Sequence, residues 1–363
     1  MKVLFVTNLP TPYRVDFFSE LSKYCELTVF FEAKRSKNLT FNWNDDKVLP
    51  FNLLFFNEFL NESRIIITLI KKVIFGDFNK IVICSYHTRT QTLLILLLKL
   101  INKSYYFETD GGIIPTKESK IKSKIKTFLI SGSKGYFSPS KESDEYLIKY
   151  GAKKNSIARY SFTSLSVNDV IEKIPSKEQK SKIKETLGVP YDKIIVSVGQ
   201  FIHRKGFDVL LESCPFFSDA VGVYIIGGKP TAEYNQIINR LKIKNVNFVE
   251  FLSKKQLDNW FLAADLFVLP TREDIWGLVI NEAMSKGLPV ITTNRCLAGL
   301  ELILDSECLC PIEDSESLGR VINKVLDDDV FSNKLSANNL KMIRKRTFEN
   351  MAMEHMTKFS KND

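Results

Sequence analysis

Short apolar runs alternate along the chain with longer stretches that can form helices. The first half carries five runs that favour β-strands, at residues 2–8, 27–31, 80–85, 104–109 and 135–140. The second half repeats the pattern, with runs at residues 194–199, 222–228, 245–251, 266–271 and 289–293. Strands that alternate with helices are typical of parallel, doubly wound sheets. The pattern therefore predicts an α/β fold with two such sheets.

A polar, lysine-rich passage at residues 171–193 separates the two series of strands. A chain of 363 residues is long enough for about two domains. We expect Rossmann-like domains at residues 1–168 and 169–345, and a C-terminal helix at 346–363 that packs back toward the first domain. Two such domains would face each other across a cleft, with ligands at the carboxyl ends of the strands.

Residues 117–134 carry a strongly amphipathic pattern, KESKIKSKIKTFLISGSK. Ile121, Ile125, Phe128 and Leu129 fall on one face of a helix, and lysines cover the rest. A helix of this kind can lie on an anionic bilayer. The apolar stripe can equally pack on the domain core while the lysines are merely solvated. The sequence leaves both interpretations open.

The net positive charge of the chain lies in residues 1–160. Residues 1–160 hold 25 Lys and Arg against 15 Asp and Glu, whereas residues 161–363 hold 26 against 27. A one-sided basic surface predicts an anionic partner, which can be a membrane surface, a phosphorylated acceptor or nucleic acid. We do not expect nucleic acid, because the chain lacks the interleaved aromatic and basic residues of stacking surfaces.

Other features of the composition predict a cytoplasmic protein. The strongest apolar run, at residues 93–98, is far shorter than a spanning helix, and no cleavable leader precedes the first predicted strand. The six cysteines are isolated or too closely spaced for a zinc knuckle, so we expect reduced thiols. No cluster of His, Cys and carboxylates predicts a metal site.

Residues 270–293, PTREDIWGLVINEAMSKGLPVITT, carry two acids eight positions apart, Asp274 and Glu282. The segment predicts a strand, a loop and a helix that ends before Gly287. Asp274 would then lie in the loop at the strand's carboxyl end, and Glu282 about one turn into the helix.

A helix N-terminus suits a phosphate, and Gly277 would let that phosphate approach the backbone. Carboxylates bind vicinal hydroxyl groups, so two acids beside a phosphate site match a nucleotide sugar. The spacing alone also fits a purely structural interpretation, in which Asp274 caps the helix and Glu282 forms a surface ion pair.

The same segment resembles the signature of the family 4 retaining glycosyltransferases, an acid, seven residues and then Glu. Residues 198–213, VGQFIHRKGFDVLLES, resemble the family's V-G-R block, and residues 298–328 resemble its G-x-x-E block. The likeness is weaker in the first half, where residues 135–151 and the opening NLPTPYRVDFFSEL are similar to segments of members that build cell-surface glycans.

The resemblance implies roles for individual residues at the donor site. Glu282 would bind the ribose hydroxyls, and Asp274 the hydroxyls of the transferred sugar. Lys205 would pair with the departing diphosphate, where a fixed positive charge is useful. The amides of Gly277 and Leu278 would add to the phosphate site. Without the motif, Lys205 is better interpreted as a solvated turn lysine.

Three positions depart from the family pattern. Asp274 stands where Glu is usual, and Gln200 stands where the V-G-R block has Arg; Arg204, in the same loop, is the candidate replacement. The first loop, NLPTPYR, lacks glycine. Arg14 in this loop is a candidate ligand for the donor phosphates, and a structural salt bridge is the alternative.

On the acceptor side, the family often has His where FETDGG offers Asp110, which is followed by two glycines that leave room for a substrate. Glu108 is the alternative.

The resemblance implies the GT-B architecture and a retaining, metal-independent glycosyltransferase of hexosyltransferase type with no cofactor. Such an enzyme would move a sugar from a nucleoside diphosphate sugar to a glycan or lipid-linked acceptor. We expect it to act in bacterial surface polysaccharide or lipopolysaccharide biosynthesis, in the cytoplasm and in peripheral contact with the membrane. Residues 117–134 are the candidate for a contact with its anionic inner face. The alternatives are a non-catalytic GT-B partner subunit and a sugar-nucleotide epimerase. A dehydrogenase is disfavoured because no G-x-G-x-x-G follows the first strand.

Overall fold

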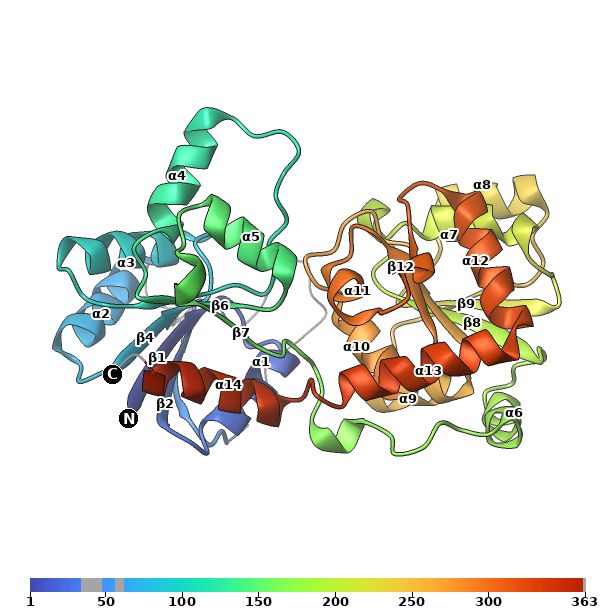
Figure 1. Cartoon of the computed structure of the whole chain (residues 1–363), viewed down its shortest axis with the longest axis horizontal. Helices are drawn as coiled ribbons and strands as arrows, with labels where there is room; N and C mark the ends of the chain where they lie inside the picture. Colours follow the sequence, from blue (N-terminus) through green and yellow to red (C-terminus); the bar gives the residue numbers. More distant parts are fainter. Residues whose placement is uncertain (34–47, 56–61, 362–363) are drawn as a thin grey trace. The chain divides into compact units, whose positions relative to one another are not determined.

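The computed structural model describes residues 1–33, 48–55 and 62–361. The chain divides into two compact units (Figure 1), residues 1–164 with 347–363 and residues 165–346. The domain boundaries predicted from the sequence lay at residues 168 and 345. Each unit is built around one parallel sheet flanked by helices.

The sheet of the first unit has the strand order β3-β2-β1-β4-β5-β6-β7. Its strands are β1 (Lys2–Thr7), β2 (Glu26–Phe31), β3 (Asn52–Phe55), β4 (Lys80–Ile83), β5 (Tyr106–Glu108), β6 (Gly135–Ser138) and β7 (Ile157–Arg159). The sequence predicted five of them. It missed β3 and β7, which are the two edge strands and lack the fully buried apolar run of a central strand.

Alternate residues of β1 face opposite sides of this sheet. Leu4 and Val6 belong to a core that the sheet shares with α2, α3, α4 and α5. Phe5 packs on the other side, against Phe17 of α1 and His355 of α14, and these two helices also contact each other. The helices of this unit are α1 (Pro12–Leu21), α2 (Glu62–Phe75), α3 (Arg89–Leu100), α4 (Lys120–Ile130), α5 (Lys141–Lys149) and α14 (Phe348–Lys361).

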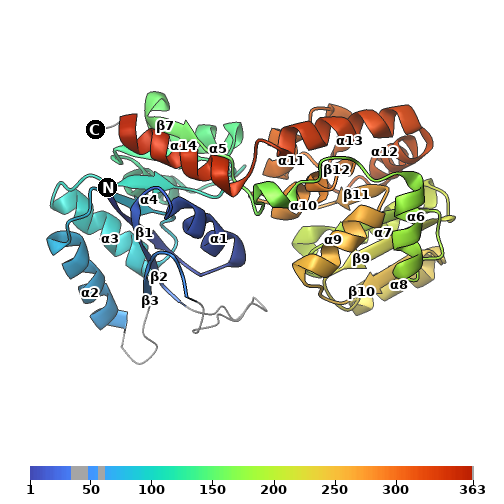
Figure 2. The same ribbon diagram turned by 90° about the horizontal axis from the view of Figure 1, so that it is seen from below.

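The sheet of the second unit has the order β10-β9-β8-β11-β12-β13. Its strands are β8 (Lys193–Val198), β9 (Val221–Ile226), β10 (Val246–Val249), β11 (Leu266–Leu269), β12 (Val290–Thr293) and β13 (Leu309–Cys310). The sequence predicted all but β13, which has only two residues. Figure 2 shows the helices of this unit around the sheet. They are α6 (Lys177–Thr186), α7 (Phe207–Ser213), α8 (Ala232–Leu241), α9 (Lys254–Ala263), α10 (Leu278–Ser285), α11 (Leu297–Leu302), α12 (Ser315–Asp327) and α13 (Asp329–Ile343).

The amphipathic segment at 117–134 forms the helix α4, capped by the Ser119 hydroxyl. Leu129 is buried, but Ile121, Ile125 and Phe128 are 73%, 54% and 55% exposed. The interpretation that the whole stripe packs on the core is therefore wrong, because only its C-terminal end does so.

The six cysteines are free thiols, as expected, and five of them are buried. Among the described residues, none of the helices combines the length and the apolar character needed to cross a bilayer.

Candidate functional site

The loop between β11 and α10 holds Asp274 in a fixed position. The Trp276 side chain is buried, and its indole N–H donates to Asn281 Oδ1 at 2.9 Å. The Trp276 carbonyl accepts a hydrogen bond from the amide of Ala298 at 3.0 Å. The Asp274 carbonyl accepts a hydrogen bond from the amide of Leu297 at 3.1 Å. Trp276 thus anchors the loop between the two acids, which explains an aromatic residue at this place.

Gly277 is the N-cap residue of α10. Its φ of +100° lies in the left-handed region, and a Cβ there would stand 3.0 Å from Cys296 Sγ. With no side chain, Gly277 leaves the first amides of α10 without a side-chain cap. Asp274 is not the N-cap residue, and its carboxylate pairs with Lys205 and Arg204. The helix terminus instead retains N–H groups suited to an anion.

A second loop lies against this one. After β8 the chain forms a 3₁₀ helix, His203–Lys205, whose Arg204 carbonyl accepts bonds from Thr271 Oγ1 and the Arg272 amide, each 2.8 Å long. Gly206 has φ +68°, and a Cβ there would stand 2.0 Å from the Pro270 carbonyl oxygen. The close approach of the two loops therefore requires glycine at 206.

This approach brings two cations onto one carboxylate. Lys205 Nζ lies 2.5 Å from Asp274 Oδ2, and Arg204 Nη1 lies 3.2 Å from Asp274 Oδ1. Lys205 and Asp274 are largely buried, whereas Arg204 is half exposed. The cluster keeps a net positive charge near the uncapped end of α10. Such a group can bind a diphosphate through charge-assisted hydrogen bonds.

The remaining donor-site candidates lie on the same elements. Leu278 begins α10, and Glu282 is partly buried about one turn later. Gln200 is exposed in the loop that leaves β8. The sequence predicted these positions, but not the ion pairs that Lys205 and Arg204 form with Asp274. The ligand assigned to each residue stays a prediction.

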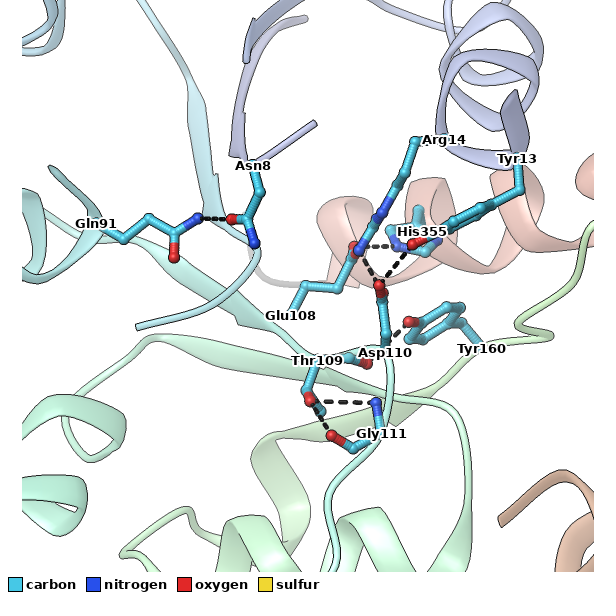
Figure 3. Close-up of polar contacts among 10 residues, drawn as sticks. All are labelled: Asn8, Tyr13, Arg14, Gln91, Glu108, Thr109, Asp110, Gly111, Tyr160 and His355. Atoms are coloured by element: carbon cyan, nitrogen blue, oxygen red, sulfur yellow. Dashed lines mark hydrogen bonds and ion pairs between the residues drawn. The ribbon is translucent and has the colours of Figure 1, made fainter. Parts of the chain in front are cut away.

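The first unit contains a buried polar cluster at the carboxyl end of β5 (Figure 3). The Arg14 guanidinium forms ion pairs with Glu108 through Nη1 and with Asp110 through Nη2. Tyr13 donates its hydroxyl to Asp110 Oδ2 at 2.9 Å. The sequence left two roles open for Arg14, and the structure shows the salt bridge; its donor-phosphate role has no support in this arrangement.

The C-terminal helix α14 completes the cluster. His355 Nε2 lies 2.9 Å from Glu108 Oε2, and His355 Nδ1 lies 2.7 Å from the Met351 carbonyl oxygen. His355 thus joins the Glu108 carboxylate to the backbone of α14. The side chains of Glu108 and His355 are fully buried, whereas that of Asp110 is 25% exposed. Of the two carboxylates, Asp110 is therefore the one that a substrate can reach.

Sequence reasoning missed the contributions of Tyr13 and His355. Tyr13 precedes Arg14 in the glycine-free loop, where nothing marks its hydroxyl as a partner of Asp110. His355 stands 247 residues after Glu108. No local pattern signals a contact over such a separation, and a lone histidine is more often structural than functional.

The cluster shifts the pKa values of its two carboxyl groups in opposite directions. Burial by itself would raise the pKa of Glu108, but the Arg14 charge and the His355 hydrogen bond outweigh burial and hold the pKa at about 2. Burial raises the pKa of Asp110, and the Glu108 carboxylate adds to that increase while Arg14 opposes it. Glu108 is thus the fixed anion of the cluster.

We expect this cluster to make the protein acid-sensitive. Because folding lowers the pKa of Glu108 from 4.5 to about 2, its stabilising contribution is complete above about pH 4.5 and is lost as the pH falls toward 2. Folding raises the pKa of Asp110, so its contribution to stability has the opposite pH dependence and is lost as the pH rises. Urea unfolding of the wild type and Glu108→Gln should give stability curves whose difference shrinks by about 3 kcal/mol over that interval. Parallel curves would contradict the prediction.

Comparison with known proteins finds a family model that matches most of the second unit. Residues 178–342 match the model of the family described as glycosyl transferases group 1. This part of the chain is similar to that family. The group 1 residues include both loops of the Lys205–Asp274 cluster and the whole of α10.

Two curated relatives are similar to part of the chain. Lipopolysaccharide glucosyltransferase WaaG of Escherichia coli K12 is 28% identical over 167 residues, which cover 43% of this chain and 42% of WaaG. O-antigen biosynthesis glycosyltransferase WclY of Escherichia coli is 27% identical over 161 residues, with the same coverage of 43% and 42%. The chain thus spans about two fifths of the length of these curated relatives.

A solved structure extends the likeness to both units. The crystal structure of Anabaena Alr3699/HepE in complex with UDP has a TM-score of 0.81 and 17% sequence identity, covering 99% of this chain and 100% of that one. Likeness at this identity shows the fold, which is the GT-B pair of doubly wound domains. The GT-B fold predicted from the sequence is confirmed.

Proposed function

We propose that the protein is a retaining glycosyltransferase that moves a sugar from a nucleoside diphosphate sugar to a glycan or lipid-linked acceptor. The observation that carries the proposal is the cluster of Arg204, Lys205 and Asp274 beside the uncapped N-terminus of α10. It lies within residues 178–342, which match the model of the group 1 family. The structures of HepE with UDP, and with UDP and glucose, support a nucleotide-sugar donor.

The cluster suits a departing diphosphate. As the bond to the sugar breaks, negative charge grows on the phosphate oxygen, and Lys205, Arg204 and the first amides of α10 would stabilise that charge. Lys205 is held by Asp274, so its ammonium group is in place before the reaction. Asp274 would also bind hydroxyls of the transferred sugar, and Glu282, farther along α10, those of the ribose.

Retention follows if the acceptor attacks from the face that the diphosphate leaves. The phosphate oxygen then takes the acceptor proton, so the donor cluster needs no separate general base. The mechanism requires no metal ion or cofactor, and we expect transfer to continue in the presence of a chelator. Asp110, held by Tyr13 and Arg14 at the end of β5, would bind an acceptor hydroxyl.

The acceptor belongs to the biosynthesis of a bacterial surface polysaccharide. The relatives WaaG and WclY are named for lipopolysaccharide and O-antigen biosynthesis, respectively. We expect an acceptor that carries a lipid-linked phosphate, to which the net positive charge of residues 1–160 is suited. We place the enzyme in the cytoplasm, at the inner face of the cell membrane.

Thermal unfolding against UDP, GDP, dTDP, CMP and ADP tests the donor site. We expect one nucleotide to stabilise the wild type by about 2.7 kcal/mol at a hundred times its dissociation constant. The stabilisation should be lost in Glu282→Ala, because the ribose would lose its bidentate acceptor. Glu316→Ala, an exposed glutamate of α12, is the matched control and should keep the full shift.

The outcomes separate the alternatives. Equal shifts in Glu282→Ala and the wild type would remove the ribose role, and no shift with any nucleotide would favour a non-catalytic GT-B subunit. Conversion of the donor sugar without an acceptor would identify an epimerase instead. Transfer that yields an inverted anomeric configuration would overturn the retaining mechanism.

A further inference from the structure

A cavity in the second unit lies at the amino ends of three strands. Its lining includes Lys193, the first residue of β8, and Asp265 and Pro289, which directly precede β11 and β12. Further walls come from α6, α13 and the C-terminal end of α12 (Figure 1), and the volume is about 600 Å³, a size typical of small-molecule sites. The loops that carry Lys205 and Asp274 follow the carboxyl ends of β8 and β11. This cavity, which we call the α6–α13 cavity, is therefore separate from the donor cluster.

Two lysines of α6 converge on one carboxylate in the α6–α13 cavity. Lys180 Nζ lies 3.3 Å from Asp265 Oδ1, and Lys184 Nζ lies 2.7 Å from Asp265 Oδ2. The lysines stand four positions apart, so they share one face of the helix. Their side chains are only 17% and 8% exposed. This end of the cavity therefore holds two largely buried ammonium groups for a single carboxylate.

The other acids of the lining do not balance this excess positive charge. Asp329 is paired with Lys177 at 2.8 Å, and both side chains are more than half exposed. Glu185 and Asp192 are exposed as well, so water screens their charges. Lys193 adds a further cation to the lining. A small anion that enters the cavity would thus meet a net positive charge at its buried end.

The pKa of Lys180 shows that its charge is only partly compensated. Burial lowers this pKa, the Asp265 carboxylate opposes the effect, and the Lys184 charge adds to it, with a net lowering. A buried cation in this state carries an unfavourable desolvation cost. A bound anion would reduce that cost, because it would neutralise the excess charge.

Both lysines retain hydrogen-bonding capacity for a ligand. Within the part of the chain that the structure describes, Lys180 donates to the Ala264 carbonyl at 2.7 Å and to Asp265. Lys184 donates to the Asp192 carbonyl and to Asp265. An ammonium group has three N–H donors, so each lysine has one left. A phosphate group, with several terminal oxygens and a negative charge, can accept from both.

The rest of the α6–α13 cavity suits an organic body attached to that phosphate. Pro289, Val325 and Leu326 are buried and give the cavity an apolar wall. Ser332 and Ser336, the latter 5% exposed, line it from α13 and supply hydroxyl groups. A sugar ring matches both features, because it has apolar C–H faces and hydroxyl groups at its edge.

We propose that the α6–α13 cavity binds a sugar phosphate, with the phosphate on Lys180 and Lys184 and the sugar against α12 and α13. This site is additional to the donor site, and the inference does not depend on the proposed function. A ligand held between α6 and α13 would stabilise the folded second unit.

Isothermal titration of the full chain with glucose 6-phosphate tests the site. We expect glucose 6-phosphate to bind more tightly than inorganic phosphate, and glucose without phosphate to give no measurable binding. Lys180→Met should weaken the binding of glucose 6-phosphate by about 10- to 100-fold, because one charge-assisted hydrogen bond is lost. The matched control is Lys182→Met on the same helix, an exposed lysine outside the cavity lining, which should leave the affinity unchanged.

A second variant tests the cavity without removing a charge. Ser336→Leu keeps Lys180 and Lys184 but places a larger side chain in the space that the sugar would occupy. It should abolish measurable binding of glucose 6-phosphate and leave that of inorganic phosphate largely unchanged. Urea unfolding checks that Lys180→Met and Ser336→Leu remain folded.

Four results would overturn the proposal. The first is the absence of binding by either phosphate. The second is equal affinity for inorganic phosphate and glucose 6-phosphate, which would leave the sugar without a role. The third is an unchanged affinity for glucose 6-phosphate in folded Lys180→Met or Ser336→Leu. The fourth is binding that is lost in Lys205→Ala and retained in Lys180→Met, since the phosphate would then occupy the donor loops.

Discussion

Replacing Lys205 by alanine should lower the turnover of sugar transfer by about 100- to 1,000-fold. Lys205 Nζ is held 2.5 Å from Asp274 Oδ2, beside the N-terminus of α10. A cation fixed in this way stabilises charge that develops as the diphosphate departs, so its loss should lower kcat more than it raises KM. The measurement is steady-state transfer from the sugar nucleotide whose base stabilises the wild type.

A control variant tests whether the loss of turnover is specific to Lys205. Lys341→Ala removes an exposed lysine from α13 of the same unit and should retain wild-type turnover. Thermal unfolding of Lys205→Ala shows whether the fold survives without the ion pair. A folded Lys205→Ala protein with a kcat within a few-fold of the wild type would remove Lys205 from the proposed mechanism.

Replacing Arg14 by methionine should lower the free energy of unfolding by about 3–5 kcal/mol. Methionine keeps much of the apolar stem but removes the charge that both Glu108 and Asp110 face. The buried Glu108 carboxylate and the partly exposed Asp110 carboxylate would then repel each other without the guanidinium between them. Urea unfolding measures the loss, and the double variant Arg14→Met with Glu108→Gln should recover part of it, because only one carboxylate is left without Arg14.

An exposed ion pair provides the comparison for Arg14. Arg159 Nε lies 2.8 Å from Asp144 Oδ2, with the arginine half exposed. Water screens this pair, so Arg159→Met should cost less than about 1 kcal/mol. Equal losses for the two variants would show that burial of the Arg14 cluster does not set its contribution to stability.

Local patterns made most of the fold predictable. Buried parallel strands are short, continuous apolar runs, and ten of these appear in the sequence at the places where the structure has strands. The sequence did not predict the edge strands β3 and β7 or the two-residue strand β13. A strand with a partner on only one side needs less apolar sequence. The loop and helix around Asp274 were predictable because Gly277, Gly287 and Pro289 mark their ends.

The sequence predicted which residues belong to the candidate site, but only part of the contacts that they make. A motif could assign Lys205, Asp274 and Glu282 to one site, but not the ion pairs of Lys205 and Arg204 with Asp274. Those contacts depend on Gly206, whose missing side chain lets one loop approach the carbonyl of Pro270. The amphipathic pattern of residues 117–134 likewise predicted a helix without saying whether its stripe was covered.

The sequence by itself determined the two doubly wound units and the residue types at the donor loop, because strand periodicity, helix ends and turn glycines act over a few neighbouring residues. Tertiary structure alone decided that His355 meets Glu108, that Arg14 is enclosed by two carboxylates and that Ile121, Ile125 and Phe128 remain exposed. These contacts join residues far apart in the chain. Which side chains meet is then fixed by how helices pack on the sheet, and no local pattern records that packing.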